Sequence, residues 1–321
     1  MNYLITGGAG FIGLNLANVL SNDTGNKIVI FDNLSKQSLD EDFKKIIKRK
    51  NIKFIKGDLK NISKTIKSKS FDYVYHFAAI LGVKKVIQNP YSTLIENIIS
   101  TKKIIEFAKK QKSLKNICFT STSEVYAKTL ESGLTKYPTP EKVDFLIKGD
   151  FNERSSYALS KIVGEYLFNY SSLKFVIFRP HNIFGPRMGF AHVMPQLVKK
   201  FLNKKKNFIF VDNPQHKRTF CHIDYAIQLI LKISHNKKTS RQVYNIGTST
   251  KAISINELAK HIKKILNSNK KIRFTKVINK DHSPKKRKPE MNKSKVFTNH
   301  THNFEQGLIS TVKWYENYYL N

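Results

Sequence analysis

Short apolar runs alternate with amphipathic stretches along the first half of the chain. Apolar runs of strand length lie at residues 2–6, 27–32, 52–55, 71–77, 116–120 and 173–178. Between them, residues 90–110 and 157–168 repeat apolar side chains at helical spacing. This alternation predicts an α/β fold with a doubly wound parallel (Rossmann) sheet, which binds ligands at the carboxyl ends of its strands.

The pattern changes after residue 178. Pro, Gly and His interrupt residues 180–195, and later segments return to the earlier alternation. We therefore expect a first domain of residues 1–178 with return segments near 222–250. A smaller, interleaved C-terminal domain is expected at residues 179–221 and 251–321.

A glycine-rich loop follows the first predicted strand directly. Gly7, Gly10 and Gly13 have Gly-x-x-Gly-x-x-Gly spacing and lead into a helical pattern. Glycine allows a tight turn and close approach of a pyrophosphate, and a helix N-terminus offers amides and a positive dipole. Asp32 ends the second strand 19 residues after Gly13. A carboxylate there accepts hydrogen bonds from ribose hydroxyls and repels a 2′-phosphate, so the pattern predicts a dinucleotide site that favours NAD over NADP.

Tyr157 and Lys161 form a candidate acid/base pair. They are four residues apart in a predicted helix, so both side chains lie on one face. A tyrosine titrates near pH ~10 in water, and an ammonium held nearby lowers that pKa. The spacing also arises by chance in a lysine-rich chain, so the pair gains its weight from the glycine loop.

The charge of the chain is strongly positive. Its 321 residues include 57 Lys and Arg against 23 Asp and Glu, a net charge of +34. Only eight of the basic residues are Arg and the lysines are spread along the chain, which favours solvated surfaces over a nucleic-acid partner. A positive field of this size attracts anionic small substrates.

The sequence argues against a membrane partner, disulfide bonds and a metal site. No apolar run approaches the ~20 residues of a membrane span, so no membrane partner is expected. The two cysteines, Cys118 and Cys221, lack Cys-x-x-Cys spacing, which favours a reduced, cytoplasmic protein without disulfides. His181, His192 and His222 lack metal-ligand spacing, so no metal is expected.

A series of short motifs follows one order along the chain. They lie at residues 6–13, 32–33, 57–59, 76–79, 120–126, 157–161, 179–186 and 244–247. Together they resemble the extended short-chain dehydrogenase/reductase family, in its NAD-dependent nucleotide-sugar epimerase/dehydratase branch. The resemblance runs over nearly the whole chain. It implies that the first domain binds NAD and the second binds a nucleoside-diphosphate sugar.

The resemblance implies catalytic roles for four residues. Tyr157 would take the proton of the sugar C4 hydroxyl while a hydride passes to the nicotinamide. Lys161 would bind the nicotinamide ribose and hold the pKa of Tyr157 down, and Thr122 would hydrogen-bond the same sugar oxygen. Glu124 stays open between a helix-capping acid and a catalytic base.

The resemblance also implies two sets of binding residues. The cofactor set is Gly7, Gly10, Phe11, Ile12, Gly13, Asp32, Asn33, Asp58, Leu59, Ala78, Ala79, Asn97, Tyr157 and Lys161. The substrate set is Thr122, Ser123, Asn182, His192, Arg218 and Arg287. A guanidinium binds a diphosphate in bidentate fashion, which suits the last two positions.

Details of the motifs separate the possible reactions only in part. Related 4,6-dehydratases carry Thr-Asp-Glu where this chain has Thr122-Ser123-Glu124, and Ser123 cannot readily donate the proton that expels the C6 hydroxyl. The triad and residues 287–290 resemble UDP-glucuronate decarboxylases, whereas residues 80–85 and 188–193 resemble epimerases.

We therefore expect NAD-dependent oxidation at C4 of a nucleoside-diphosphate sugar, ending in 4-epimerisation. Net 4-dehydrogenation, decarboxylation and C5 inversion stay open as outcomes of the same first step. A non-catalytic nucleic-acid-binding protein with the same fold is the alternative from another class. By family analogy, helices 90–110 and 157–170 would form a homodimer interface.

Overall fold

The computed structural model describes residues 1–35, 40–149, 151–275 and 285–320. The chain divides into two compact units. The first comprises Met1–Lys128, Asp144–Pro180 and Ile227–Tyr244, and the second Thr129–Val143, His181–Ala226 and Asn245–Asn321. Residues 129–143 thus group with the second unit, whereas the predicted boundary assigned them to the first.

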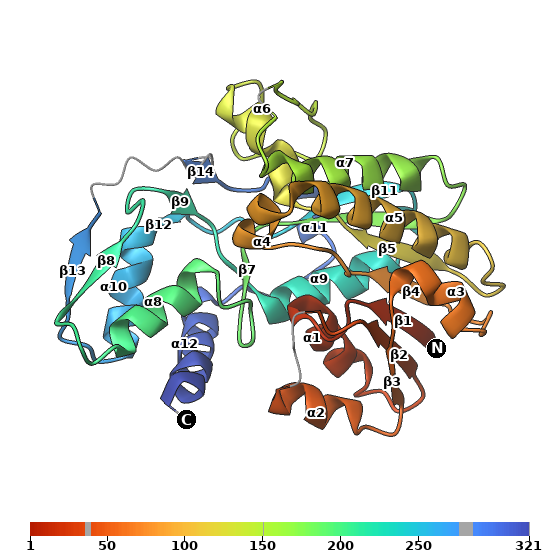
Figure 1. Ribbon diagram of the computed structural model, residues 1–321, viewed down its shortest axis with the longest axis horizontal. Coiled ribbons are helices and arrows are strands. Elements are labelled where there is room, and N and C mark those ends of the chain that lie inside the picture. Colours follow the sequence, from red (N-terminus) through yellow and green to blue (C-terminus); the bar gives the residue numbers. More distant parts are fainter. Residues whose placement is uncertain (36–39, 150, 276–284, 321) are drawn as a thin grey trace. The chain divides into compact units, whose positions relative to one another are not determined.

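A seven-stranded sheet forms the centre of the first unit (Figure 1). Its order is β11-β6-β5-β4-β1-β2-β3, with parallel registers for the pairs from β6 to β3. The strands are β1 Asn2–Thr6, β2 Lys27–Asp32, β3 Ile52–Lys56, β4 Tyr73–His76, β5 Asn116–Thr120, β6 Phe175–Pro180 and β11 Gln242–Ile246. The predicted doubly wound parallel sheet is confirmed.

Helices accompany the strands of this sheet along the chain. They are α1 Phe11–Leu20, α2 Glu41–Ile47, α3 Ile62–Thr65, α4 Val83–Gln88, α5 Pro90–Ala108 and α7 Ser155–Asn169, with 3-10 turns η1 Leu59–Asn61, η2 Ser123–Tyr126 and η3 Lys237–Thr239. Two further helices, α6 Ala127–Glu131 and α9 Ile223–His235, contain residues of both units. Figure 1 shows α5 and α7 side by side. A Cβ on Gly164 would lie 2.6 Å from the Phe119 ring, so this glycine lets α7 approach β5 closely.

The second unit combines short strands with three longer helices. Figure 1 shows α8 Val193–Leu202, α10 Ile255–Ile265 and α12 Phe304–Leu320 packed together. The other elements are α11 Asn292–Lys295, β7 Ile183–Phe184, β8 Phe208–Val211, β9 Lys217–Arg218, β10 Cys221–His222, β12 Ile253–Ser254, β13 Lys271–Phe274 and β14 Lys286–Arg287. These short strands, together, form the small sheets β10-β7, β12-β9-β14 and β13-β8.

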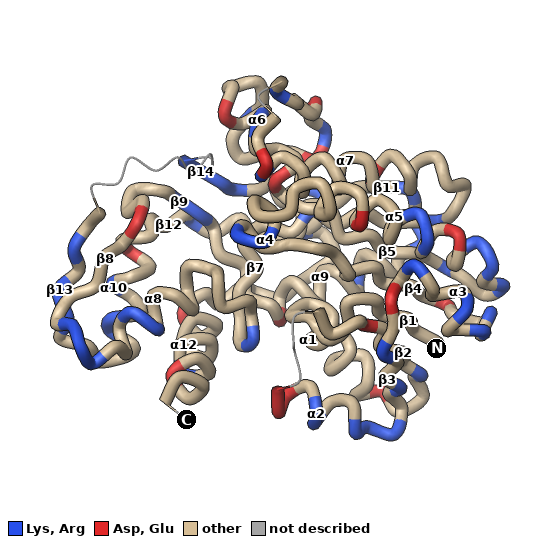
Figure 2. The backbone as a smooth tube through the Cα atoms, in the orientation of Figure 1, with Lys and Arg blue, Asp and Glu red and all other residues tan. Residues whose placement is uncertain are grey.

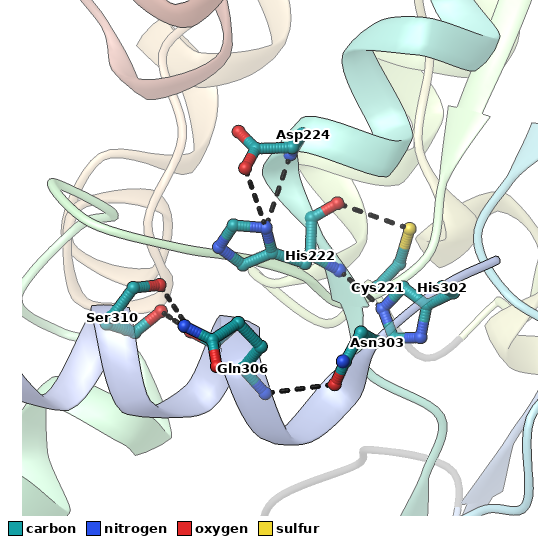
Figure 3. A network of polar contacts seen from close by, with 9 residues as sticks. Cys221, His222, Asp224, His302, Asn303, Gln306 and Ser310 are labelled. Carbon is teal, nitrogen blue, oxygen red and sulfur yellow. Dashed lines mark hydrogen bonds and ion pairs between the residues drawn. The ribbon is translucent and has the colours of Figure 1, made fainter. Parts of the chain in front are cut away.

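A network of polar contacts lies at the start of α9 (Figure 3). Nδ1 of His222 lies 3.4 Å from the carboxylate of Asp224, and the His222 amide donates to Nε2 of His302 at 2.9 Å. Burial and the neighbouring His222 lower the pKa of His302 to about 4, so its ring is neutral at pH 7 and accepts this bond. The network ties the segment before α12 to the start of α9.

The positive charge of the chain is not concentrated in one unit. Figure 2 shows Lys and Arg distributed over both units. Within the described residues, no helix is long and apolar enough to cross a bilayer.

Candidate active site

The glycine loop between β1 and α1 is closely packed. Gly7 has a φ of +68°, and a Cβ on it would lie 2.5 Å from the amide nitrogen of Ala78. A Cβ on Gly13 would lie 2.6 Å from the carbonyl oxygen of Gly7. The Gly10 amide donates to that same oxygen at 3.0 Å, which closes the turn. Only glycine fits at Gly7 and Gly13 without displacing backbone.

This loop fits the pyrophosphate of a dinucleotide. Gly10 is the N-cap of α1 and has no side chain to cover the first turn, where Phe11 and Ile12 present their amides. The positive end of the helix dipole lies at the same place. Ala78 and Ala79, after β4, are partly exposed beside the loop.

Asp32 lies next to the glycine loop. One carboxylate oxygen accepts from the Ala9 amide at 3.1 Å, and the other accepts from the Leu34 amide at 2.8 Å. Because a carboxylate has about four lone-pair sites, Asp32 is held in place and retains acceptor capacity for ribose hydroxyls. Asn33 accepts from the Ser35 amide at 3.0 Å, which shapes the turn after β2.

The other predicted cofactor residues hold backbone in place. Asp58 caps η1 by accepting from the Lys60 amide at 2.8 Å, and Leu59 is buried behind it. Asn97 bonds the backbone of Ile80 in both directions, at 2.7 and 3.1 Å, and donates to Ser160 Oγ at 3.2 Å. Asn97 therefore links α5, α7 and the segment after β4.

Tyr157 and Lys161 lie on one face of α7. Lys161 is only 3% exposed, and its Nζ donates to the carbonyl oxygen of Thr120 at 2.8 Å. The same Nζ lies 5.9 Å from the centre of the Tyr157 ring. The ammonium is therefore directed to the carboxyl end of β5, with the phenol beside it.

The pKa of Tyr157 is shifted upward. Burial raises it most, the carboxylate of Glu124 raises it further, and a hydrogen bond with Thr122 lowers it in part. The direction is opposite to the lowering expected from Lys161, because burial and the Glu124 carboxylate outweigh the hydrogen bond of Thr122. The phenol is therefore protonated at pH 7 in this structure.

Glu124 lies at the start of η2. Thr122 is the N-cap and accepts from the Glu124 amide at 3.2 Å, and Ser123 is buried in the turn. The Glu124 carboxylate is 3.6 Å from an Arg154 guanidinium nitrogen, and its side chain is 24% exposed. The turn is thus capped by Thr122, while the Glu124 carboxylate is ion-paired and close enough to affect Tyr157.

In the second unit, Arg218 and Arg287 are neighbours in register on β9 and β14. They are only 8% and 9% exposed. Asn182 donates to the Thr219 carbonyl oxygen at 3.0 Å, and the Thr219 amide donates to that of Arg287 at 3.3 Å. Two guanidinium groups in register can bind the oxygens of a diphosphate, so the three predicted residues form a candidate diphosphate site.

His192 takes a different place in the second unit. It is exposed, it is the N-cap of α8, and its amide donates to the Gly189 carbonyl oxygen at 3.0 Å. No three His, Cys, Asp or Glu side chains of the described ranges gather closely enough to hold a metal ion.

One buried ion pair near Lys161 was not identified from the sequence, that of Glu165 on α7 and Arg179 on β6. Glu165 and Arg179 bind each other at 2.5 Å. The available signal was the position of Glu165, four residues after Lys161 and hence on the same helix face.

Known proteins are similar to this chain over most of its length. A model of the "NAD dependent epimerase/dehydratase family" matches residues 3–247. The chain is 31% identical to the UDP-N-acetyl-alpha-D-glucosaminuronate decarboxylase of Bacillus cytotoxicus, over 97% of each protein.

Solved structures share the fold. A UDP-glucuronic acid 4-epimerase from Bacillus cereus, solved with UDP-glucuronic acid and NAD, has a TM-score of 0.82 at 24% identity, covering 99% of this chain and 100% of its own. A dTDP-glucose 4,6-dehydratase from Bacillus anthracis, in complex with NAD, has a TM-score of 0.79 at 25% identity, covering 99% and 97%.

Proposed function

Because the chain belongs to the NAD-dependent epimerase/dehydratase family, we propose that it inverts C4 of a nucleoside-diphosphate sugar through a 4-keto intermediate. It is an NAD-dependent enzyme of the extended short-chain dehydrogenase/reductase family. The observation that carries the proposal is the partly buried Tyr157, hydrogen-bonded to Thr122 and beside Lys161. As a phenolate, this side chain would remove a hydroxyl proton, which is the first step of the reaction.

Different residues of the first unit would bind the cofactor and transfer the proton. The loop from Gly7 to Gly13 would hold the pyrophosphate, and Asp32 the adenosine ribose. Bound NAD supplies the hydride acceptor and, as a cation, favours the phenolate of Tyr157. Tyr157 would then accept the C4 proton while Thr122 hydrogen-bonds the same oxygen, and it would return the proton after the sugar has turned.

Arg218, Arg287 and Asn182 are proposed to bind the diphosphate and ribose of the substrate. Two guanidinium groups next to each other match the two negative phosphates, and the fork geometry fixes their orientation. The specificity of the enzyme for base and sugar would be set elsewhere in the second unit.

Decarboxylation of a nucleotide-linked uronic acid is the second candidate. It is favoured by the decarboxylase of Bacillus cytotoxicus, which aligns over 97% of this chain, and by the sequence Thr122-Ser123-Glu124. Oxidation at C4 places a ketone β to the C5 carboxylate, which makes loss of CO₂ possible. Both candidates share the roles of Tyr157, Lys161 and Thr122.

The test is a substrate screen read by proton NMR. UDP-glucose, UDP-glucuronate and UDP-N-acetylglucosamine are each incubated with the purified protein and NAD. A 4-epimer is the expected product, whereas a pentose with released CO₂ would favour the second candidate. Absence of turnover with every sugar nucleotide, or full activity of Tyr157→Phe, contradicts the proposal.

We also propose a homodimer formed through α5 and α7. Three large side chains here are exposed: Tyr91 on α5, Tyr166 on α7 and Tyr170 directly after α7. Light scattering of Tyr166→Glu would give a monomer if they lie in an interface. Cys118 and Cys221 are free and buried, which supports a reducing, cytoplasmic location.

A further inference from the structure

We propose that the buried ion pair of Glu165 and Arg179 is a positioning device for the active site. It holds Ser121, and thereby the adjacent Thr122, at the place where Thr122 hydrogen-bonds Tyr157. This inference rests on the proposed function, in which Tyr157 is the acid/base group.

The ion pair itself is bidentate and almost fully buried. Arg179 Nε donates to Glu165 Oε1 at 2.9 Å, and Nη2 donates to Oε2 at 2.5 Å. Arg179 is 3% and Glu165 6% exposed. The remaining Arg179 nitrogen, Nη1, donates to the Tyr126 hydroxyl at 2.8 Å. The pair therefore joins β6, α7 and η2 in one network.

The network reaches the catalytic segment through Ser121. The Ser121 hydroxyl donates to Glu165 Oε1 at 2.5 Å. One residue earlier, the Thr120 carbonyl oxygen accepts from Lys161 Nζ at 2.8 Å. Lys161 and Glu165 are one helical turn apart, so α7 holds two consecutive residues of the chain with two charged side chains. The next residue is Thr122.

Stability alone does not explain a charged pair in this place. Removing two charges from water is costly, and apolar residues of similar volume often stabilise a protein as well or better. What a fully bonded charged network adds is fixed geometry, since each partner has one good arrangement. Here the geometry fixes the carboxyl end of β5 against the helix that carries Tyr157.

The position of Thr122 affects the phenol directly. The hydrogen bond of Thr122 lowers the pKa of Tyr157, against the larger effect of burial. Releasing Ser121 lets Thr122 move away and weakens this bond. The pH at which Tyr157 becomes an effective base would then rise, although no group in contact with the phenol has been changed.

Two variants test this chain of contacts. Ser121→Ala removes the link to β5 and keeps the ion pair, while Glu165→Gln removes the charge and keeps the shape. A matched control is Ser171→Ala, which deletes a buried hydroxyl two residues after the C-terminal end of α7 that donates to the Phe168 carbonyl oxygen at 2.7 Å.

We expect Ser121→Ala and Glu165→Gln to lower kcat about tenfold, as for one lost charge-assisted hydrogen bond, with KM nearly unchanged. In Ser121→Ala, the rising limb of the pH–rate profile, measured with UDP-glucose and UDP-glucuronate, should move up by roughly half a pH unit. Ser171→Ala should leave the profile in place. A merely structural role would change the folded fraction but not this limb.

A second readout needs no turnover. In protein labelled with ¹³Cζ-tyrosine, the Tyr157 resonance is assigned by its loss in Tyr157→Phe. It should shift in Ser121→Ala and not in Ser171→Ala, while NAD affinity stays constant. If Glu165→Gln does not fold, the Ser121→Ala variant by itself tests whether the ion pair positions Thr122.

An unmoved resonance and an unmoved pH limb in Ser121→Ala would overturn the inference. Activity of Tyr157→Phe would instead remove the proposed function, and the resonance would still report whether Ser121 controls the surroundings of Tyr157.

Discussion

Replacing Glu124 by glutamine tests how charge near Tyr157 sets the pH dependence of the reaction. The Glu124 carboxylate raises the pKa of the phenol, and it is itself paired with Arg154 at 3.6 Å. Tyr157 must be deprotonated to accept the C4 proton, so the rate rises with pH toward its pKa. Removing the negative charge lowers that pKa, and the rising limb should move to lower pH.

The size of this shift follows from the exposure of Glu124. Two unit charges roughly 4 Å apart interact by about 4 kcal/mol at an effective dielectric constant near 20, which sets an upper bound here. Glu124 is about a quarter exposed and already neutralised in part by Arg154, so most of this is screened. We expect a displacement of about half to one pH unit.

The opposite change supplies the sharpest check. Arg154→Gln leaves the Glu124 charge uncompensated, so the limb should move to higher pH. Glu153→Gln is the control, since it removes an exposed carboxylate next to Arg154. The assay is the initial rate of product formation from UDP-glucuronate between pH 6 and 10, followed by proton NMR. Equal or same-direction shifts in Glu124→Gln and Arg154→Gln would refute this electrostatic reasoning.

Three further predictions concern other parts of the molecule. Asp32→Ala should weaken NAD binding and raise the NADP-to-NAD affinity ratio by at least about tenfold, measured by fluorescence titration; an unchanged ratio would mean that another group recognises the ribose. Arg218→Lys should raise KM for the nucleotide sugar by about tenfold or more with NAD affinity constant, because the bidentate contact is lost; an unchanged KM would remove Arg218 from the site. Burial and the Lys161 charge lower the pKa of His76 to about 3, so folding keeps it neutral while the unfolded chain protonates it near pH ~6.5. Stability due to His76 is thus complete above pH ~6.5 and falls by about 2 kcal/mol by pH 5, and His76→Gln should flatten the fall in urea midpoint between those values.

The central strands were predictable because they are continuous apolar runs. The predicted bounds 2–6, 27–32 and 116–120 agree with β1, β2 and β5. The predicted strand 173–178 begins later, at Phe175, because the Leu173 amide is used in a turn that ends on Ser171 Oγ. Two-residue strands such as β9 and β14 have no period that a sequence pattern could show.

The parts of the site also differ in how far the sequence alone can predict them. The glycine loop could be predicted because its spacing is local and its chemistry depends on backbone. The Glu165–Arg179 pair joins residues on different elements, so the sequence offered only the helical spacing of Glu165. The raised pKa of Tyr157 depends on burial and on Glu124, which only tertiary packing determines.

The central claim is oxidation at C4 of a nucleotide sugar, with Tyr157 as the base. The most direct test is turnover of UDP-glucose and UDP-glucuronate that carry deuterium at C4. We predict that the deuterium passes to NAD and returns to C4 of the same molecule, and that Tyr157→Phe abolishes this transfer. Exchange of the label with solvent, or product formed without transient NADH absorbance, would contradict the account.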